Sequence, residues 1–75
     1  MIPVIDVQGT GKKIKENMER IGLSVADVQK EFNLTCKASV YHWVHGRNLP
    51  TIDNLVVLSR LFGCKLDDLL VVKWI

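Results

Sequence analysis

Cysteine is scarce in this 75-residue sequence, and its two cysteines, Cys36 and Cys64, form neither a C-x-x-C pair nor a larger framework. A small secreted domain usually carries several disulfides, so we expect free, half-buried thiols and a reducing compartment. His42 and His45 follow Cys36 closely, but Cys36 would lie on the opposite face of a helix from them. The sequence therefore predicts no metal site.

Long apolar runs are also missing. The run of residues 69–72 is far shorter than a membrane-spanning segment, and residues 1–15 contain no basic stretch ahead of an apolar core. These absences predict a cytoplasmic protein that does not enter a membrane. There is no glycine-rich phosphate loop, nucleophile elbow or paired-carboxylate pocket, and the pair Asp67 and Asp68 is typical of the first turn of a helix. We expect neither enzymatic activity nor a cofactor.

The sequence does contain enough apolar material for one small core. Hydrophobic residues make up 48% and charged residues 24% of the chain, which is typical of a single globular domain. A chain this short buries only about 60% of the surface that its unfolded form exposes, so dimerisation would be a useful supplement to its stability. The net charge of +2 says little about partners, but residues 32–50 include Lys37, Arg47 and two histidines and no acidic residue.

Apolar side chains spaced three and four residues apart predict five short helices. The first would span residues 12–21, with Thr10 as its N-cap and Gly22 at its end. Ser24 would cap a second helix that ends at residue 32, and the third would span residues 36–45. Further helices are expected between the cap Thr51 and Gly63, and over residues 66–70.

Both ends of the sequence are rich in β-branched residues. Residues 1–8 resemble an extended arm, and residues 4–7 and 71–75 both have the pattern of strands. An isolated strand needs a partner, so we expect the two to pair, either within one chain or between two chains in a two-fold dimer. Trp74 and Ile75 also favour a covering partner. The whole chain, residues 1–75, would be one domain with an arm over 1–9, a core over 11–71 and a strand-like tail over 71–75.

The order of the motifs resembles a known family. Residues 22–50, GLSVADVQKEFNLTCKASVYHWVHGRNLP, and the following TIDNLVVLSRLFGCKLDDLL are similar to the Xre/Cro-type, phage-repressor-like helix-turn-helix family. The resemblance covers residues 11–71 and implies an all-α, five-helix, lambda-repressor-like domain. It also implies a transcriptional regulator, typically a repressor and a homodimer, that binds double-stranded DNA by inserting the helix over residues 36–45 into the major groove.

The resemblance assigns site residues position by position. The residues that would face the bases are Lys37, Ala38 and His42, with Ser39 and Tyr41 at the edges of the same face. Those that would hold phosphates are Ser24, His45, Arg47 and Asn48. Lys37 would donate to guanine O6 and N7 and His42 would read a purine N7, whereas phosphate contacts would fix the register. Tyr41 fits a half-exposed structural role equally well, and we expect Trp43 in the core.

Several positions depart from the family pattern. Val25 stands where the family has a phosphate-reaching Gln, which would leave the backbone N–H groups of the helix start to meet the phosphate. Gln29 and Asn33 replace the frequent Ala and Gly, and the turn is about one residue longer. Met18 and Val44 stand where many relatives pair Arg with Glu, and two apolar side chains avoid a buried unpaired charge.

A second class of function stays open at this point. The modest charge, the loss of the Gln at Val25 and the small Ala38 are also compatible with a protein-interaction module on the same fold, with weak or no DNA binding. A regulator of the antitoxin type, which binds both DNA and a protein partner, would combine the two roles.

Overall fold

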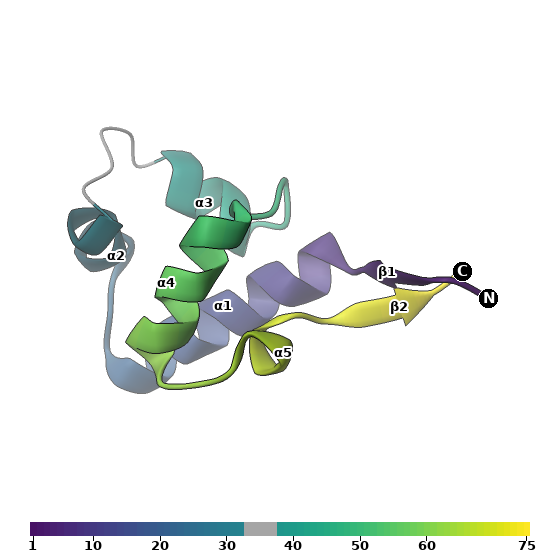
Figure 1. The fold of residues 1–75 in the computed structure, drawn as a ribbon. Coiled ribbons are helices and arrows are strands. Elements are labelled where there is room, and N and C mark those ends of the chain that lie inside the picture. The colour runs from purple at the N-terminus through teal and green to yellow at the C-terminus, as the bar shows by residue number, and fades with distance from the viewer. Residues whose placement is uncertain (33–37) are drawn as a thin grey trace.

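The computed structural model describes residues 1–32 and 38–75, which form five helices and a two-stranded antiparallel sheet (Figure 1). The elements in chain order are β1 (Pro3–Ile5), α1 (Val7–Ile21), α2 (Val25–Phe32), α3 (Ala38–Val44), α4 (Ile52–Phe62), α5 (Leu66–Leu69) and β2 (Val72–Trp74). The predicted five-helix architecture is therefore confirmed, and so is the pairing of the terminal strands.

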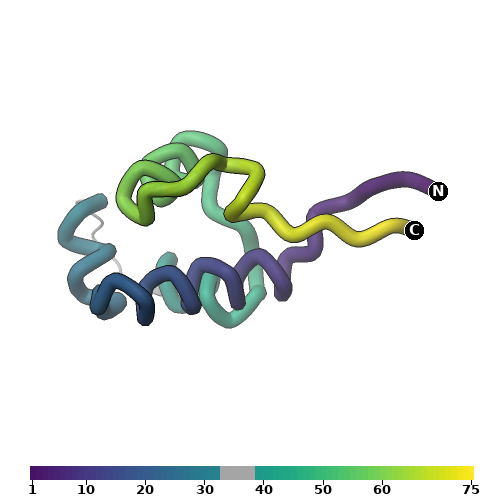
Figure 2. The backbone as a smooth tube through the Cα atoms, turned by 90° about the horizontal axis from the view of Figure 1, so that it is seen from below, coloured from purple at the N-terminus to yellow at the C-terminus, as the bar shows by residue number. Residues whose placement is uncertain are grey.

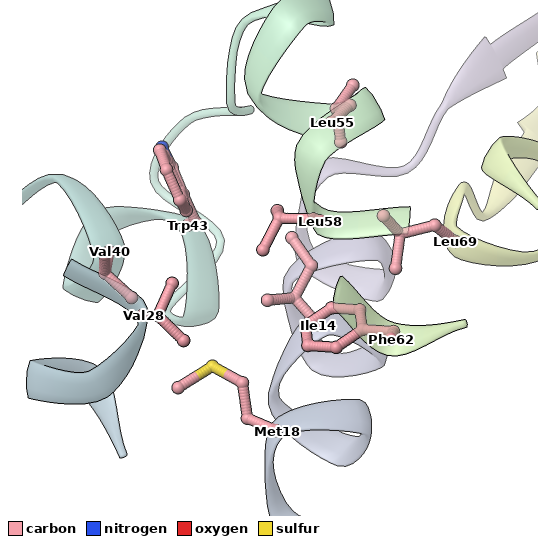
Figure 3. Packing of buried hydrophobic residues seen from close by; sticks show 9 residues of the cluster. All are labelled: Ile14, Met18, Val28, Val40, Trp43, Leu55, Leu58, Phe62 and Leu69. Atoms are coloured by element: carbon pink, nitrogen blue, oxygen red, sulfur yellow. The ribbon is translucent and has the colours of Figure 1, made fainter. Parts of the chain in front are cut away.

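One hydrophobic core joins all five helices (Figure 3). Its buried side chains are Ile14, Met18, Val28, Val40, Trp43, Leu55, Leu58, Phe62 and Leu69. Trp43 is only 5% exposed, as predicted, and its ring meets that of Phe32 edge to face, with centroids 5.6 Å apart and planes at 82°. This contact fixes the inner side of α3 against α2.

The first helix begins earlier than the sequence predicted. Asp6, rather than Thr10, is its N-cap: the Asp6 carboxylate accepts a hydrogen bond from the Gly9 N–H at 3.0 Å, and the helix starts at Val7. Gly9 and Gly11 therefore lie inside α1 instead of ending an extended arm. Close packing explains Gly11, because a Cβ there would overlap the Trp43 carbonyl oxygen at the end of α3.

The two strands form a ribbon that projects from the helical body in both views (Figures 1 and 2). In its antiparallel register Pro3 lies opposite Trp74, and Ile5 lies opposite Val72. The first strand is shorter than the predicted residues 4–7 because the residues that follow Ile5 serve as the cap and first turn of α1. The pairing takes place within one chain, which holds the two ends side by side.

Thr10 joins this ribbon to the helical body. Its side chain is fully buried, and its hydroxyl oxygen accepts a hydrogen bond from the Val71 N–H at 3.0 Å. The Val71 carbonyl in turn accepts from the Asp6 N–H at 2.8 Å. The residue that we expected to cap the first helix thus satisfies a backbone donor at the base of the ribbon.

The remaining boundaries agree with the sequence where the structure describes them. The Thr51 hydroxyl caps α4 by accepting from the Asn54 N–H at 3.2 Å, and Gly63 ends α4 with φ 69°. Cys64 is a free, half-buried thiol as expected. The predicted features at Asn33, Thr35 and Cys36 lie outside the described residues. Each helix in the described ranges is too short or too polar to cross a lipid bilayer.

Candidate nucleic-acid interface

The third helix has a buried side and an open side. Val40 and Trp43 point into the core, whereas Tyr41 is 46% exposed and His45, one turn later, is exposed. The rings of Tyr41 and His45 stack, with centroids 6.1 Å apart and planes at 11°. His42 and Ser39 are half-buried at the borders of this open side. The described part of α3 therefore offers a polar and aromatic surface with no acidic residue.

Two of the predicted base-facing residues are not placed by the structure. Lys37 lies outside the described residues. Ala38 begins α3, and its side chain is likewise outside the description. The structure locates Ser39, Tyr41 and His42 on α3. The base-reading roles of all five residues stay predictions.

The end of α3 is held by a tight glycine turn. The Gly46 N–H donates to the Trp43 carbonyl at 3.1 Å, and the Arg47 N–H donates to the His42 carbonyl at 2.9 Å. Gly46 has φ 71°, and a Cβ on it would lie 2.8 Å from the Gln8 Cα in the first turn of α1. This turn places Arg47, which is exposed, immediately beyond the open side of α3.

The start of α2 is closed by reciprocal hydrogen bonds. The Ser24 hydroxyl oxygen accepts from the Asp27 N–H at 3.2 Å, and the Asp27 carboxylate accepts from the Ser24 N–H at 2.9 Å. The hydrogen bond from the Ser24 backbone N–H, together with that involving the Ser24 side chain, lowers the pKa of Asp27 below its ordinary value of 3.8. A negative charge is therefore fixed at this helix start.

This arrangement changes what α2 can offer to a phosphate. The first N–H groups of a helix have no intrahelical acceptor, which leaves those of Val25 and Ala26 available for an anion. The Asp27 carboxylate would repel the same anion. Ser24 is exposed, but its hydroxyl oxygen already accepts from the helix. The sequence predicted the available N–H groups but not the competing carboxylate.

A hollow of about 310 Å³ lies beside the open side of α3, and its lining residues come from α1, the start of α2 and α3. They are Lys15, Met18, Glu19, Leu23, Ser24, Val25, Tyr41, Val44 and His45. Met18 and Val44, at the positions where many relatives carry an ion pair, both line it. Lys15, which the sequence analysis did not single out, lines this hollow together with Tyr41 and His45, and so does the acidic Glu19. The sequence contains no feature that distinguishes Lys15 from the other charged residues on the polar side of α1.

Comparison with known families identifies the family to which this chain belongs. A family described as helix-turn-helix matches residues 14–69, which is most of the chain. The chain belongs to this helix-turn-helix family, of the Xre and lambda-repressor type. The family resemblance drawn from the sequence is therefore confirmed.

Solved structures show the same fold. The helix-turn-helix domain is similar to the crystal structure of the DNA-binding domain of BldD and to the structure of the S. venezulae BldD DNA-binding domain. Each has a TM-score of 0.72 and 21% sequence identity, and each match covers 88% of this chain and 94% or 97% of the other. No curated protein matches the sequence significantly.

Proposed function

We propose that this helix-turn-helix domain is a transcriptional regulator that binds double-stranded DNA sequence-specifically, with α3 in the major groove. The observation that carries the proposal is the open side of α3, where Tyr41 and His45 are exposed and Arg47 follows directly. The major groove of B-DNA is about 12 Å wide and admits one helix. A helix with its inner side fixed by Val40 and Trp43 can enter the groove without unfolding.

Base contacts would come from the first turns of α3 and the residue before it. We assign them to Lys37, Ala38 and His42, with Ser39 and Tyr41 at the edges. Half-burial of His42 leaves part of its ring free to donate to or accept from a base edge. Tyr41 is 46% exposed and stacks on His45, and we assign its ring a contact with a thymine methyl or a sugar.

Phosphate contacts would surround this helix and fix its register. We assign them to Ser24, His45, Arg47 and Asn48, as the family resemblance suggested, and add Lys15 because it lines the same hollow as Tyr41 and His45. Contacts of this kind strengthen binding to all sequences and make it salt-dependent. Repression is the proposed mode of action, since an occupied operator blocks transcription without any further surface on the regulator.

One observation favours the competing hypothesis of a protein-interaction module. The charged Asp27 carboxylate stands at the helix start that would otherwise meet a DNA phosphate. Affinity for DNA would then depend on Lys15, Arg47 and the residues of α3. Measurements of DNA binding separate the two functions.

The test is fluorescence-anisotropy binding to duplexes from the region upstream of the protein's own gene, measured at several salt concentrations. We expect Arg47→Ala to weaken binding to every duplex and to lower the dependence of log affinity on log salt by about one. We expect His42→Ala to reduce discrimination between sequences, by about 1–3 kcal/mol for a lost base contact. Lys65→Ala, at the N-cap of α5, removes one positive charge outside this surface and should leave both properties unchanged.

Absence of any binding below about 10–100 μM would contradict the proposal, because it would leave only non-specific association. Equal effects of Arg47→Ala and Lys65→Ala would contradict the assigned surface, since the loss would then reflect net charge alone.

A further inference from the structure

The hollow beside the open side of α3 has an apolar floor. Met18, which belongs to the buried core, is only 4% exposed, and Leu23, Val25 and Val44 are half-buried and pack against that core. All four residues line the hollow. Apolar side chains beside an open space lack the dispersion contacts that a close-packed neighbour supplies. An apolar ligand in the hollow would provide these contacts and displace water from the floor.

The exposed rim of the hollow carries balanced charge. Lys15 and Glu19 are the formally charged residues of the lining at pH 7, and they lie one turn apart on α1. Their opposite charges largely cancel for a molecule bound between them. Ser24 and Tyr41 add hydroxyl groups, which can donate or accept hydrogen bonds. The rim therefore favours an uncharged molecule with one polar group over an anion or a cation.

One wall of the hollow is aromatic. Tyr41 and His45 line it, and their rings stack with planes at 11° and centroids 6.1 Å apart. Aromatic rings pack favourably on one another and on the sulfur of methionine. Met18 supplies such a sulfur among the lining residues (Figure 3). The chemistry of the lining therefore suits an aromatic ligand better than an aliphatic one.

The volume of the hollow sets the size of the ligand. An apolar cavity of about 150 Å³ holds a single benzene ring, and pockets for small molecules begin at about 300 Å³. The hollow measures about 310 Å³. It therefore has room for a molecule with two fused rings.

Hydrogen bonds hold the walls of the hollow in place before any ligand binds. The Leu23 N–H donates to the Met18 carbonyl at 2.8 Å, which fixes Leu23 beyond the end of α1. The reciprocal capping bonds at Ser24 fix the start of α2. At the end of α3, the His45 N–H donates to the Tyr41 carbonyl at 3.0 Å. A site that is already formed loses little conformational entropy when it binds.

We infer that this hollow is a binding site for a small, uncharged aromatic molecule with two fused rings and one hydrogen-bonding group. The rings of the ligand pack on the apolar floor and against the wall of Tyr41 and His45. Its polar group binds the hydroxyl of Ser24 or of Tyr41. The ligand thus contacts α1, the start of α2 and α3 at the same time.

Occupation of the hollow opposes DNA binding, a consequence that rests on the proposed function. Tyr41 and His45 are assigned to the surface that meets DNA, and the same two residues line the hollow. A ring packed against them takes the space that the DNA would occupy, so ligand and DNA compete. Competing ligands weaken each other's binding reciprocally. The aromatic molecule therefore releases the regulator from its operator.

Nuclear magnetic resonance on the full chain without DNA tests the site itself. The probe is indole, which has two fused rings, no charge and one N–H donor. We expect saturable binding with a dissociation constant of about 1 mM or lower. Nuclear Overhauser contacts should join the indole ring to methyl groups of Met18, Leu23 and Val44. The methyl groups of Ile52 and Ile75, which are exposed outside the hollow, should show none.

Two results of this measurement would overturn the inference. Contacts spread evenly over the exposed methyl groups would mean non-specific adsorption of indole. Absence of saturable binding would leave the hollow to a side chain of a protein partner.

A matched pair of variants locates the binding independently of these contacts. Val44→Phe places a larger side chain at the floor of the hollow. Val56→Phe makes the same change on α4, where Val56 is 41% exposed and does not line the hollow. We expect Val44→Phe to weaken indole binding by about tenfold or more and Val56→Phe to leave it unchanged, both with the helical circular dichroism spectrum of the natural chain. Equal affinities of the two variants for indole would contradict the assigned site.

Charged analogues of the probe test the class of ligand. Tryptamine adds an ammonium group to the indole ring, and indoleacetate adds a carboxylate. We expect both to bind more weakly than indole, because Lys15 and Glu19 balance each other at the rim. Tighter binding of either analogue would overturn the assignment of an uncharged ligand.

Fluorescence anisotropy with the duplexes of the DNA-binding test measures the effect of the ligand on DNA affinity. Indole at about ten times its dissociation constant should weaken DNA binding by the natural chain about tenfold, as competition requires, and should not affect DNA binding by Val44→Phe. An unchanged DNA affinity of the indole-saturated natural chain would overturn the competition. If no duplex binds at all, the proposed function fails, whereas the magnetic resonance result still decides the ligand site.

Discussion

Gly46 shows at the residue scale how a single position fixes the candidate DNA-binding helix. Its φ of 71° lets α3 end there, and the absence of a side chain lets Gln8 of α1 approach. Gly22 has nearly the same backbone conformation, with φ 73°, but a Cβ on it would find no atom within 4 Å. Comparing the same substitution at these two glycines therefore separates the free-energy cost of backbone strain from the cost of a close contact.

We expect Gly46→Ala to destabilise the domain more than Gly22→Ala. Both alanines would suffer the left-handed strain of about 1–2 kcal/mol. Only the alanine at residue 46 would also collide with Gln8, which adds about 1–3 kcal/mol as in other overpacked sites. Equilibrium unfolding in urea measures the difference. Equal losses of stability would mean that α3 can shift away from α1 at no cost.

At the scale of the element, α2 combines a stabilising cap with a charge that opposes DNA. The Asp27 carboxylate accepts from the Ser24 N–H, and this bond lowers the pKa of Asp27. The same charge lies where the N–H groups of Val25 and Ala26 would meet a phosphate. The Asp27 carboxylate would therefore stabilise α2 and weaken the binding of a phosphate at its start.

We expect Asp27→Asn to lower stability at neutral pH and to raise affinity for DNA. A lowered folded-state pKa means that the carboxylate stabilises the fold fully above its unfolded value of 3.8 and that this contribution is lost as pH falls through the folded-state pKa. The stability gap between Asp27→Asn and the natural chain should therefore be largest near neutral pH and close in acid. Urea unfolding across this pH range measures the gap, and anisotropy measures the affinity.

Asp53→Asn is the control, because it also removes a carboxylate from the first turn of a helix but not from this helix start. If both variants raised DNA affinity equally, the effect would come from net charge and not from the position of Asp27.

At the scale of the whole molecule, the ribbon ties the two ends of the chain to the helical body through Thr10 and presents its apolar faces to solvent. A small domain has little stability in reserve, so association through this ribbon would contribute to folding itself. Of the two kinds of strand pairing that the sequence left as alternatives, the structure shows pairing within one chain, and pairing between chains stays a prediction.

We expect the melting temperature of the natural chain to rise with protein concentration, because a dimer binds the folded state and not the unfolded one. Thermal unfolding followed by circular dichroism over a wide concentration range provides the measurement. A concentration-independent melting temperature of the natural chain would contradict the role of association in stability.

Local patterns in the sequence were sufficient to predict several parts of this protein. Spacing of apolar residues predicted the helices and the burial of Trp43, because one face of each helix must be apolar to build a core. Local capping residues predicted the start of α4 at Thr51 and its end at Gly63. The run of family motifs predicted the helix-turn-helix fold, and β-branched ends predicted two strands.

Features that depend on distant residues emerged only from the folded chain. The pattern of Gly9 and Gly11 predicts the end of an extended segment, yet both glycines lie in α1. Gly11 is needed there because a Cβ would overlap the Trp43 carbonyl oxygen of α3. Thr10 resembles a helix cap, yet its hydroxyl serves the N–H of Val71, sixty-one positions along the chain. Lys15 lines the same hollow as Tyr41 and His45 only because α1 packs against α3 in the folded chain. Local sequence patterns determine which face of each helix is buried. Packing between segments that are distant in the sequence determines which groups each side chain contacts.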